Sequence, residues 1–259
     1  MFPEWTYFDL AILFLFVYGT LLVPLLLFVP APFGKFSRSG WGFDIDGKLG
    51  WFVMEFVACV AVPWFFFDNT DTRTDSAASY ILLTLWLVHY IHRSCYYTYI
   101  APSMNKTNPA VVLSAVQFNL CNGFINGFAL SETNESRLVS PCFWIGIVIF
   151  LMGMAANIAS DRILFSLRMQ RDVVNKGQAK RYFIPRGFLF EYVSGANYFG
   201  EIVEWIGWAI ACGNNAGVAF AFFTAANLVP RAITTHQWYL TTFQGAYPKS
   251  RKAVVPYLL

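Results

Sequence analysis

The sequence predicts an all-α membrane protein with seven transmembrane helices, and three observations lead to this prediction. Of the 259 residues, 57% are hydrophobic and only 13% are charged, whereas a soluble domain carries about 25% charged residues. A chain of this length cannot bury so much apolar surface in one core, so the excess must face lipid. Apolar stretches near the roughly 20 residues that cross a bilayer recur along the chain, and basic residues are distributed unevenly between them.

Seven apolar segments are expected to form the spans. In chain order they are residues 8–29, 49–67, 77–91, 109–129, 143–158, 194–212 and 217–232. No internal repeat or linker divides them, so residues 1–259 are expected to form a single integral membrane domain. The first segment is not expected to be a cleaved signal peptide, because it lacks a basic flank and is long enough to stay in the membrane.

The charges between these segments predict the sidedness of the protein. All but two of the 18 Lys and Arg residues, Arg73 and Arg137, lie in or beside the loops on one side and in the C-terminal segment. Because basic residues favour cytosolic loops, we expect an outside or lumenal N-terminus and a cytosolic C-terminus. The membrane is expected to be the endoplasmic reticulum or a bacterial inner membrane, and the protein is expected to be a monomer.

Composition and motifs argue against several other functions. The net charge is only +3, without a basic stripe for nucleic acid. Five scattered cysteines without a CxxC spacing argue against a disulfide framework or a zinc site, and no GxGxxG or P-loop motif is present. His89 and His92 are three residues apart, a weak metal signal, and are interpreted as hydrogen-bonded interfacial side chains. No metal site is expected.

Two polar side chains inside the spans give the sharpest chemical prediction. Glu55 lies about one turn from the inner end of the second segment, and Tyr90 lies at a similar distance in the third. Because these segments run antiparallel through a short loop, the two side chains can lie at one depth and pair. An ionisable group within a span is costly, which marks it as a functional candidate. The alternative is a Glu that a neighbouring helix caps for packing alone.

A second polar cluster lies near the inner ends of the last three segments. Its members occupy single helix faces at spacings of three, four or seven residues: Asn157, Asp161 and Arg168; Asn197, Glu201 and Glu204; Arg231, Thr235 and Tyr239. This convergence predicts a polar cavity that opens to the cytosol. Since Arg binds phosphate bidentately, the cavity could hold a phosphate-bearing cofactor. Arg162, Arg171 and Arg186 are assigned instead to snorkelling at the surface.

Five stretches connect these positions to a known family: WFVMEFVACVAVP (51–63), VHYIHR (88–93), GMAANIASDRIL (153–164), YVSGANYFGEIVEWIG (192–207) and YPKSRKAVVPY (247–257). With them the chain resembles the steroid 5α-reductase family, and within it the type 2 branch most. The resemblance implies a seven-helix membrane enzyme that reduces the Δ4 double bond of a 3-oxosteroid with NADPH.

The resemblance also implies the roles of individual residues. Glu55 and Tyr90 match the family pair that binds the 3-keto oxygen. The positions that match the NADPH site are Arg93, Tyr97, Asn157, Asp161, Arg168, Asn197, Glu201, Arg231, Thr235 and Tyr239. The positions that match the apolar substrate side are Trp51, Trp205, Phe220 and Phe223.

The chain departs from the family pattern at three places. A family Arg aligns near Ala115, and the family motif Tyr-Arg-Ile-Pro has Phe183 in place of its Arg, with Arg181 and Arg186 as possible substitutes. A run of three histidines is reduced to one, with Thr235 before it. These changes affect the expected steroid preference and cofactor contacts, but the keto-binding pair is intact.

The implied chemistry is hydride addition to the β-carbon of an enone, which moves charge to the carbonyl oxygen. Tyr90 donates a hydrogen bond to that oxygen, and Glu55 either donates when protonated or orients Tyr90. Protonation of the α-carbon is assigned to water, because no dedicated acid stands out. The alternatives are a related membrane reductase of another lipid enone, a polyprenol, an enoyl thioester or another sterol bond, a methyltransferase that uses S-adenosylmethionine, and a transporter or lipid-binding receptor.

Overall fold

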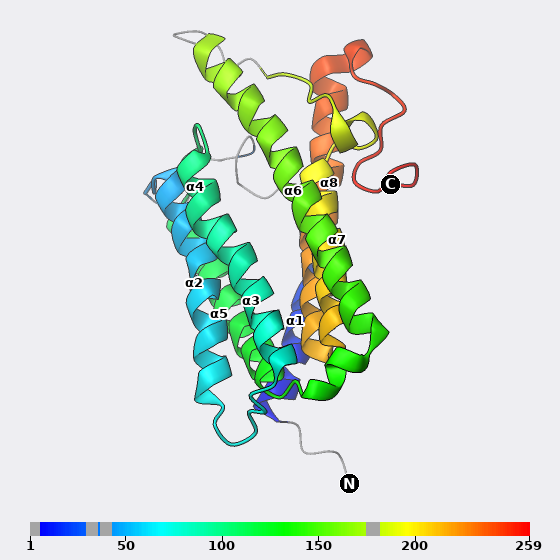
Figure 1. Ribbon diagram of the computed structural model, residues 1–259. Helices are drawn as coiled ribbons and strands as arrows, with labels where there is room; N and C mark the ends of the chain where they lie inside the picture. The colour runs from blue at the N-terminus through cyan, green and yellow to red at the C-terminus, as the bar shows by residue number, and fades with distance from the viewer. Residues whose placement is uncertain (1–5, 30–35, 37–42, 175–181) are drawn as a thin grey trace.

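The computed structural model of the chain describes residues 6–29, 36, 43–174 and 182–259, and these residues are helical apart from their loops and two isolated β-bridges. The helices form one elongated bundle (Figure 1), in which α1 begins at one end and the C-terminus lies at the other. Their bounds are α1 Tyr7–Phe28, α2 Gly47–Asp68, α3 Ala77–Ile91, α4 Tyr97–Ile100, α5 Pro109–Ser131, α6 Pro141–Val174, α7 Ala196–Cys212 and α8 Asn215–Phe243.

Each of the seven apolar segments that the sequence predicts falls on one long helix of the structure. The third prediction, residues 77–91, coincides with α3. The fifth and seventh predictions are too short, because α6 continues from residue 158 to Val174 and α8 continues from residue 232 to Phe243. Charged residues such as Arg162 and Arg168 in α6, and polar residues such as Thr235 and His236 in α8, end an apolar segment but do not end a helix.

Five of the described helices are long and apolar enough to cross a membrane, namely α1, α2, α5, α6 and α8. Helices α3 and α7 are shorter than these five, with 15 and 17 residues. The outer surface of the bundle suits lipid. On α1, for example, Phe14 is 52% exposed and Leu21 is 64% exposed.

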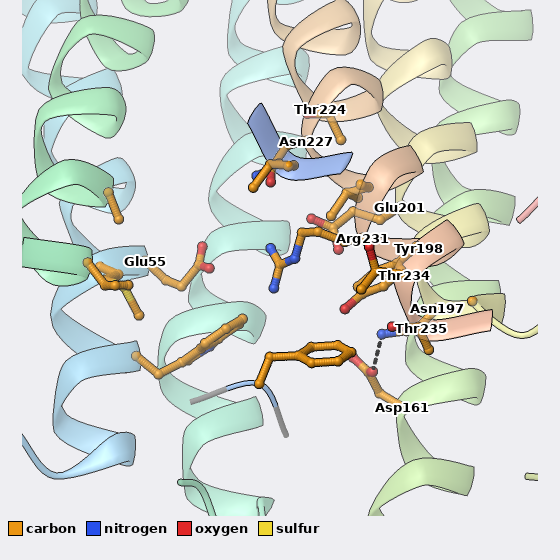
Figure 2. Close-up of a pocket in the computed structure, with 18 of the residues that line it drawn as sticks. Glu55, Asp161, Asn197, Tyr198, Glu201, Thr224, Asn227, Arg231, Thr234 and Thr235 are labelled. Carbon is orange, nitrogen blue, oxygen red and sulfur yellow. Dashed lines mark hydrogen bonds between the residues drawn. The ribbon is translucent and has the colours of Figure 1, made fainter. Parts of the chain in front are cut away.

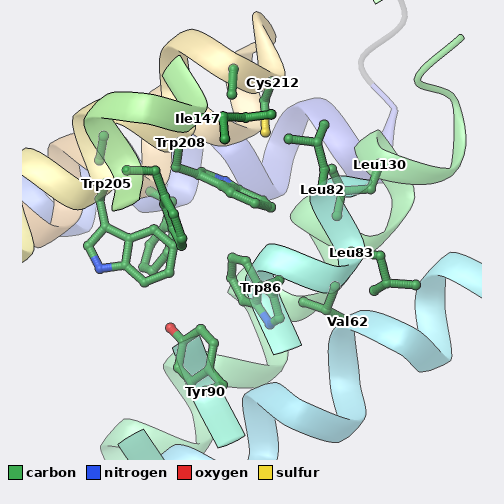
Figure 3. Close-up of a cluster of buried hydrophobic side chains, with 14 of the residues drawn as sticks. Val62, Leu82, Leu83, Trp86, Tyr90, Leu130, Ile147, Trp205, Trp208 and Cys212 are labelled. Carbon is green, nitrogen blue, oxygen red and sulfur yellow. The ribbon is translucent and has the colours of Figure 1, made fainter. Parts of the chain in front are cut away.

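The helices fall into two groups that enclose the site. Figure 1 shows α2, α3 and α5 on one side of the bundle, α6, α7 and α8 on the other, and α1 between them. Helix α2 packs along α5, α6 packs along α7, and α8 contacts both α1 and α7. The two groups meet at an aromatic core, in which Trp86 of α3 contacts Trp205 and Trp208 of α7 (Figure 3).

Glycines let α6 and α7 approach closely beside the predicted cofactor residues. A Cβ atom on Gly200 would lie 2.5 Å from the backbone nitrogen of Asn157, and Gly153 packs against the backbone of Glu204 in the same way. Only a residue without a side chain permits this approach. The close contact brings Asn157 on α6 beside Asn197 and Glu201 on α7.

Candidate active site

A cavity of about 790 Å³ lies within the bundle and receives side chains from all seven long helices. Its volume is in the range of small-molecule binding sites. The wall combines aromatic side chains, such as Phe118 and Phe223, with charged ones, such as Arg168 and Glu201. Figure 2 shows polar side chains from different helices converging on this space.

Glu55 and Tyr90, the pair predicted to act on the substrate, both line the cavity. Glu55 belongs to α2, and its carboxyl group is directed into the cavity (Figure 2). Tyr90 belongs to the last turn of α3, and its hydroxyl group is directed toward the ring of Trp205 (Figure 3). Among the described residues, neither polar group has a hydrogen-bond partner, and the two do not bond to each other. Both polar groups are therefore available to a ligand in the cavity.

A π-helical turn after α3 places a second row of side chains on the cavity. This turn, His92–Tyr96, widens the helix between α3 and α4. The hydroxyl of Ser94 donates to the carbonyl oxygen of Tyr90 at 2.6 Å, and the indole of Trp51 donates to the carbonyl oxygen of Arg93 at 3.1 Å. Such turns often occur at functional sites. Here it lets Tyr90, Arg93 and Tyr97 face the same cavity.

Arg93 is the centre of a buried polar network. Its guanidinium donates to Asp161 at 3.0 Å and to Glu201 at 3.1 Å. The rings of Trp51 and Tyr97 each lie 4.9 Å from its Cζ atom. Both carboxylates thus use the same guanidinium, and the charge of Arg93 is balanced by protein groups.

Two amide side chains extend this network between α6 and α7. Asn197 donates to Asp161 at 3.2 Å, as the dashed line in Figure 2 shows. Asn157 donates to the backbone oxygen of Asn197 at 2.9 Å and to Glu201 at 3.4 Å. The structure therefore brings together five residues that the sequence assigned to one cofactor site.

The remaining arginines of the described wall are Arg168, Arg171 and Arg231. The Cζ atom of Arg168 lies 5.5 Å from the ring of Phe165, and that of Arg231 lies 5.6 Å from the ring of Tyr198. The assignment of Arg171 to the outer surface is wrong, because this side chain lines the cavity one helical turn after Arg168. Thr235 and Tyr239 line the cavity as well.

The four aromatic residues predicted for the substrate side all line the cavity: Trp51, Trp205, Phe220 and Phe223. Trp205 and Phe220 are 1% and 3% exposed, and their ring centroids are 4.3 Å apart. Phe223 stacks on Phe118 with a centroid distance of 4.2 Å. These rings give this part of the cavity an apolar, aromatic wall.

The C-terminal segment folds back over the N-terminal end of α7, where the backbone nitrogens of Ser194 and Gly195 donate to the backbone oxygens of Lys252 and Ala253. The hydroxyl of Tyr247 and Nδ1 of His236 each lie 2.6 Å from the hydroxyl of Ser194. Arg251 is 1% exposed and donates to the backbone oxygen of Pro185 at 2.8 Å. Its second amino group lies 3.3 Å from Glu191. The backbone N–H of Gly187, followed by Arg251, holds the pKa of the Glu191 carboxyl below its ordinary value.

The positions that depart from the family pattern also surround the site. Ala115, Phe183 and Thr235 line the cavity. Arg186, one expected substitute, has a 60% exposed side chain 4.0 Å from Glu191 and does not line it. Arg181, the other, lies outside the described residues.

Comparisons with known proteins place this fold and site in a family. The sequence model of the family described as 3-oxo-5-alpha-steroid 4-dehydrogenase matches residues 105–259. The chain is 36% identical to the steroid 5-alpha-reductase DET2 of Arabidopsis thaliana, over 98% of this chain and 97% of that protein. The chain belongs to this family. It is also 38% identical to the 3-oxo-5-alpha-steroid 4-dehydrogenase 1 of Homo sapiens, over 87% of this chain and 85% of that one.

The comparisons confirm the steroid 5α-reductase resemblance that the sequence motifs indicated. The matches to the steroid 5-alpha-reductases of Gossypium hirsutum and Arabidopsis thaliana and to the rat type 1 enzyme each cover at least 87% of the relative's length. A particular similarity to the type 2 branch of the 5α-reductases stays a prediction.

Sequence reasoning missed several residues of this steroid 5α-reductase family site. The sequence placed Glu204 in the polar cluster but did not identify its partner, because His89 was interpreted as an interfacial side chain; the two form a buried pair 2.6 Å apart. Thr224 and Asn227 of α8 also line the cavity (Figure 2). They lie seven and four residues before Arg231, so the spacing rule that found Arg231, Thr235 and Tyr239 could have been extended backward to them.

Proposed function

We propose that this chain is an NADPH-dependent steroid 5α-reductase that reduces the Δ4 double bond of 3-oxo-Δ4-steroids. One observation carries the proposal: Glu55 and Tyr90 face one cavity without partners among the described residues. A ligand with a carbonyl oxygen would accept a hydrogen bond from the Tyr90 hydroxyl, and from Glu55 when that carboxyl is protonated. The names of the relatives, steroid 5-alpha-reductase and 3-oxo-5-alpha-steroid 4-dehydrogenase, support the same reaction.

The charged part of the cavity fits a dinucleotide phosphate. Arg168, Arg171 and Arg231 supply guanidinium groups, which suit phosphate oxygens. Arg93 offsets one of the two negative charges of Asp161 and Glu201, so these carboxylates repel phosphate less. The remaining residues proposed to hold the cofactor are Tyr97, Asn197, Thr235 and Tyr239, which line the cavity. Asn157 does not line it and is proposed to act through its hydrogen bonds to Asn197 and Glu201. When bound, the dihydronicotinamide supplies the hydride.

The aromatic part of the cavity is proposed to hold the steroid. Trp51, Trp205, Phe220 and Phe223 would contact its apolar rings. With the 3-keto oxygen at Tyr90 and Glu55, the β-carbon of the enone becomes the hydride acceptor. Tyr90 donates its phenolic hydrogen to the oxygen, where negative charge develops, and Glu55 either donates when protonated or orients Tyr90. Removing one such donor costs on the order of a hundredfold in rate or more.

We also propose that seven helices cross the membrane, with the N-terminus outside and the C-terminus in the cytosol. Helices α3 and α7 line the same cavity as the five longer helices, and the 17 residues of α7 extend about 26 Å at 1.5 Å per residue. The distribution of basic residues supports this orientation. It places the charged part of the cavity toward the cytosol, in the endoplasmic reticulum or a bacterial inner membrane, and the protein needs no second copy to form the cavity.

The test is turnover by the purified protein in detergent. Testosterone or progesterone is supplied with NADPH, and products are followed by mass spectrometry. We expect an NADPH-dependent product that is heavier by two hydrogen atoms. NADPH binding without conversion of either steroid would favour another lipid enone or a polyprenol as substrate. Binding of S-adenosylmethionine without binding of NADPH would contradict the reductase and favour a methyltransferase.

A further inference from the structure

A buried acid–base pair in the cavity wall has no role in the reaction as proposed above. His89 of α3 is 4% exposed and Glu204 of α7 is 0% exposed. Nδ1 of His89 lies 2.6 Å from Oε1 of Glu204. His89 lines the cavity, whereas Glu204 lies behind it. A titratable pair at this depth is costly unless it is used or fully satisfied.

The hydrogen bonds of the pair leave one nitrogen of His89 available. When Glu204 is ionised its carboxylate only accepts hydrogen bonds, so Nδ1 of His89 then carries the proton of this bond. Nε2 has no partner among the described residues. The second oxygen of Glu204, Oε2, is buried and also lacks a partner there. Since His89 is the only hydrogen-bond donor to Glu204 in the described structure, a proton held on the imidazole compensates the carboxylate charge.

His89 also lies beside the group that is proposed to bind the ketone. Its ring centroid is 4.8 Å from that of Tyr90 and 4.6 Å from that of Trp205. In an enone the α-carbon is bonded directly to the carbonyl carbon. A ligand whose carbonyl oxygen reaches the Tyr90 hydroxyl therefore carries its α-carbon into the neighbourhood of His89. Glu55 and Tyr90 face the oxygen instead, and Arg93 is held by Asp161 and Glu201.

We propose that His89 is the acid that protonates the α-carbon, with Glu204 as the positioning residue that holds the imidazolium. The inference rests on the proposed enone reduction. Hydride from a dihydronicotinamide forms the bond to the β-carbon, and the alkene electron pair moves to give the enolate. The enolate then takes the proton from Nε2 at its α-carbon, and the carbonyl reforms. His89 becomes neutral and regains a proton from solvent. One hydride and one proton account for the two added hydrogens.

The test compares single-turnover rates at saturating NADPH and steroid for the wild type, His89→Gln and His89→Ala. A general acid contributes about 10²–10⁴-fold, so we expect both variants to lose at least a hundredfold while still binding both ligands. Added imidazole should raise the rate of the His89→Ala variant at least tenfold over its rate without imidazole. The matched control is His92→Ala, because His92 lies one turn further along, packs against Tyr96 and does not line the cavity. Its rate should stay unchanged and insensitive to imidazole.

Glu204→Gln provides a separate test of the positioning role. Glutamine retains the shape and a hydrogen-bonding oxygen but lacks the charge, so we expect kcat to fall at least tenfold while KM for the steroid is unchanged. A wild-type rate in His89→Gln, or a loss in His89→Ala that imidazole does not restore, would overturn the inference while leaving the reductase in place. Absence of steroid reduction by the wild type would instead refute the proposed function itself.

Discussion

The guanidinium of Arg93 donates a 3.0 Å hydrogen bond to the carboxylate of Asp161, and this ion pair joins the two groups of helices across the cavity. Arg93 follows α3, in the group with α2 and α5, and Asp161 belongs to α6. Both side chains are almost completely enclosed, with 9% and 7% of their areas exposed. The pair therefore holds the two groups of helices together at this point of the cavity, and it balances the buried charge of Asp161.

Replacing Arg93 with Met should strongly destabilise the protein. The change leaves Asp161 and Glu201 buried without their shared cation, and breaking a buried pair in this way costs about 3–5 kcal/mol. Thermal unfolding in detergent measures the effect. Arg186→Met is the control, because that side chain is 60% exposed and its partner is 4.0 Å away; it should change stability by less than about 0.5 kcal/mol. Equal effects of the two variants would contradict the assigned role of Arg93.

Removing the arginines of the cavity should weaken cofactor binding and leave steroid binding intact. We expect Arg168→Ala and Arg231→Ala each to raise the Kd for NADPH by about tenfold or more, since hydrogen bonds to charged groups contribute about 1.5–3 kcal/mol. Equilibrium binding of NADPH and of steroid measures both effects. Arg162→Ala on the same helix is the control, because Arg162 is exposed and does not line the cavity. An unchanged Kd in both variants would show that the phosphates bind elsewhere.

A methyl group at Gly200 should separate α6 from α7. Its Cβ would lie 2.5 Å from the backbone nitrogen of Asn157, so the helices must move apart, at a cost of about 1–3 kcal/mol. The same movement should weaken NADPH binding, because Asn157 bonds to the backbone of Asn197. Gly245→Ala is the control, as no atom lies within 4 Å of the added Cβ there. A fully stable Gly200→Ala variant would be inconsistent with this packing.

The anchor of the C-terminal segment should weaken in acid. The pKa of Glu191 lies below its ordinary value of 4.5 because of the Gly187 N–H and Arg251. A lowered pKa in the folded state means that the stabilisation is present above pH 4.5 and is lost as the pH falls through the folded value. Glu191→Gln should therefore unfold at a lower temperature than the wild type near pH 7, and the two should converge below pH 4.5. A difference that persists in acid would exclude this carboxylate as the cause.

The positions of the helices could be predicted because apolar segments are a local property of the sequence. The spacing of Asn157 and Asp161, and of Asn197 and Glu201, also placed these residues on single helix faces, and the structure brings the faces together. The extent of α6 could not be predicted from hydropathy, since its helix continues through charged residues to Val174.

Specific side-chain contacts between distant segments, such as that of His89 with Glu204, could not be predicted from the sequence. His89 and Glu204 are 115 residues apart, and nothing local indicates which residue lies opposite each one. The placement of Arg171 failed for a related reason. A basic residue near a helix end fits both a surface and a cavity, and only the position of Tyr182 and Ser103 around it decides between them.

The most direct test of the account is the rate of steroid reduction at saturating NADPH and steroid in Glu55→Gln and Tyr90→Phe, beside the wild type. Both changes keep the shape of the side chain, so ligand binding can be verified in each variant. We predict that the wild type forms the 5α-reduced ketone and that each variant is slower by about a hundredfold or more. Full activity in both variants would contradict the claim that Glu55 and Tyr90 polarise the ketone.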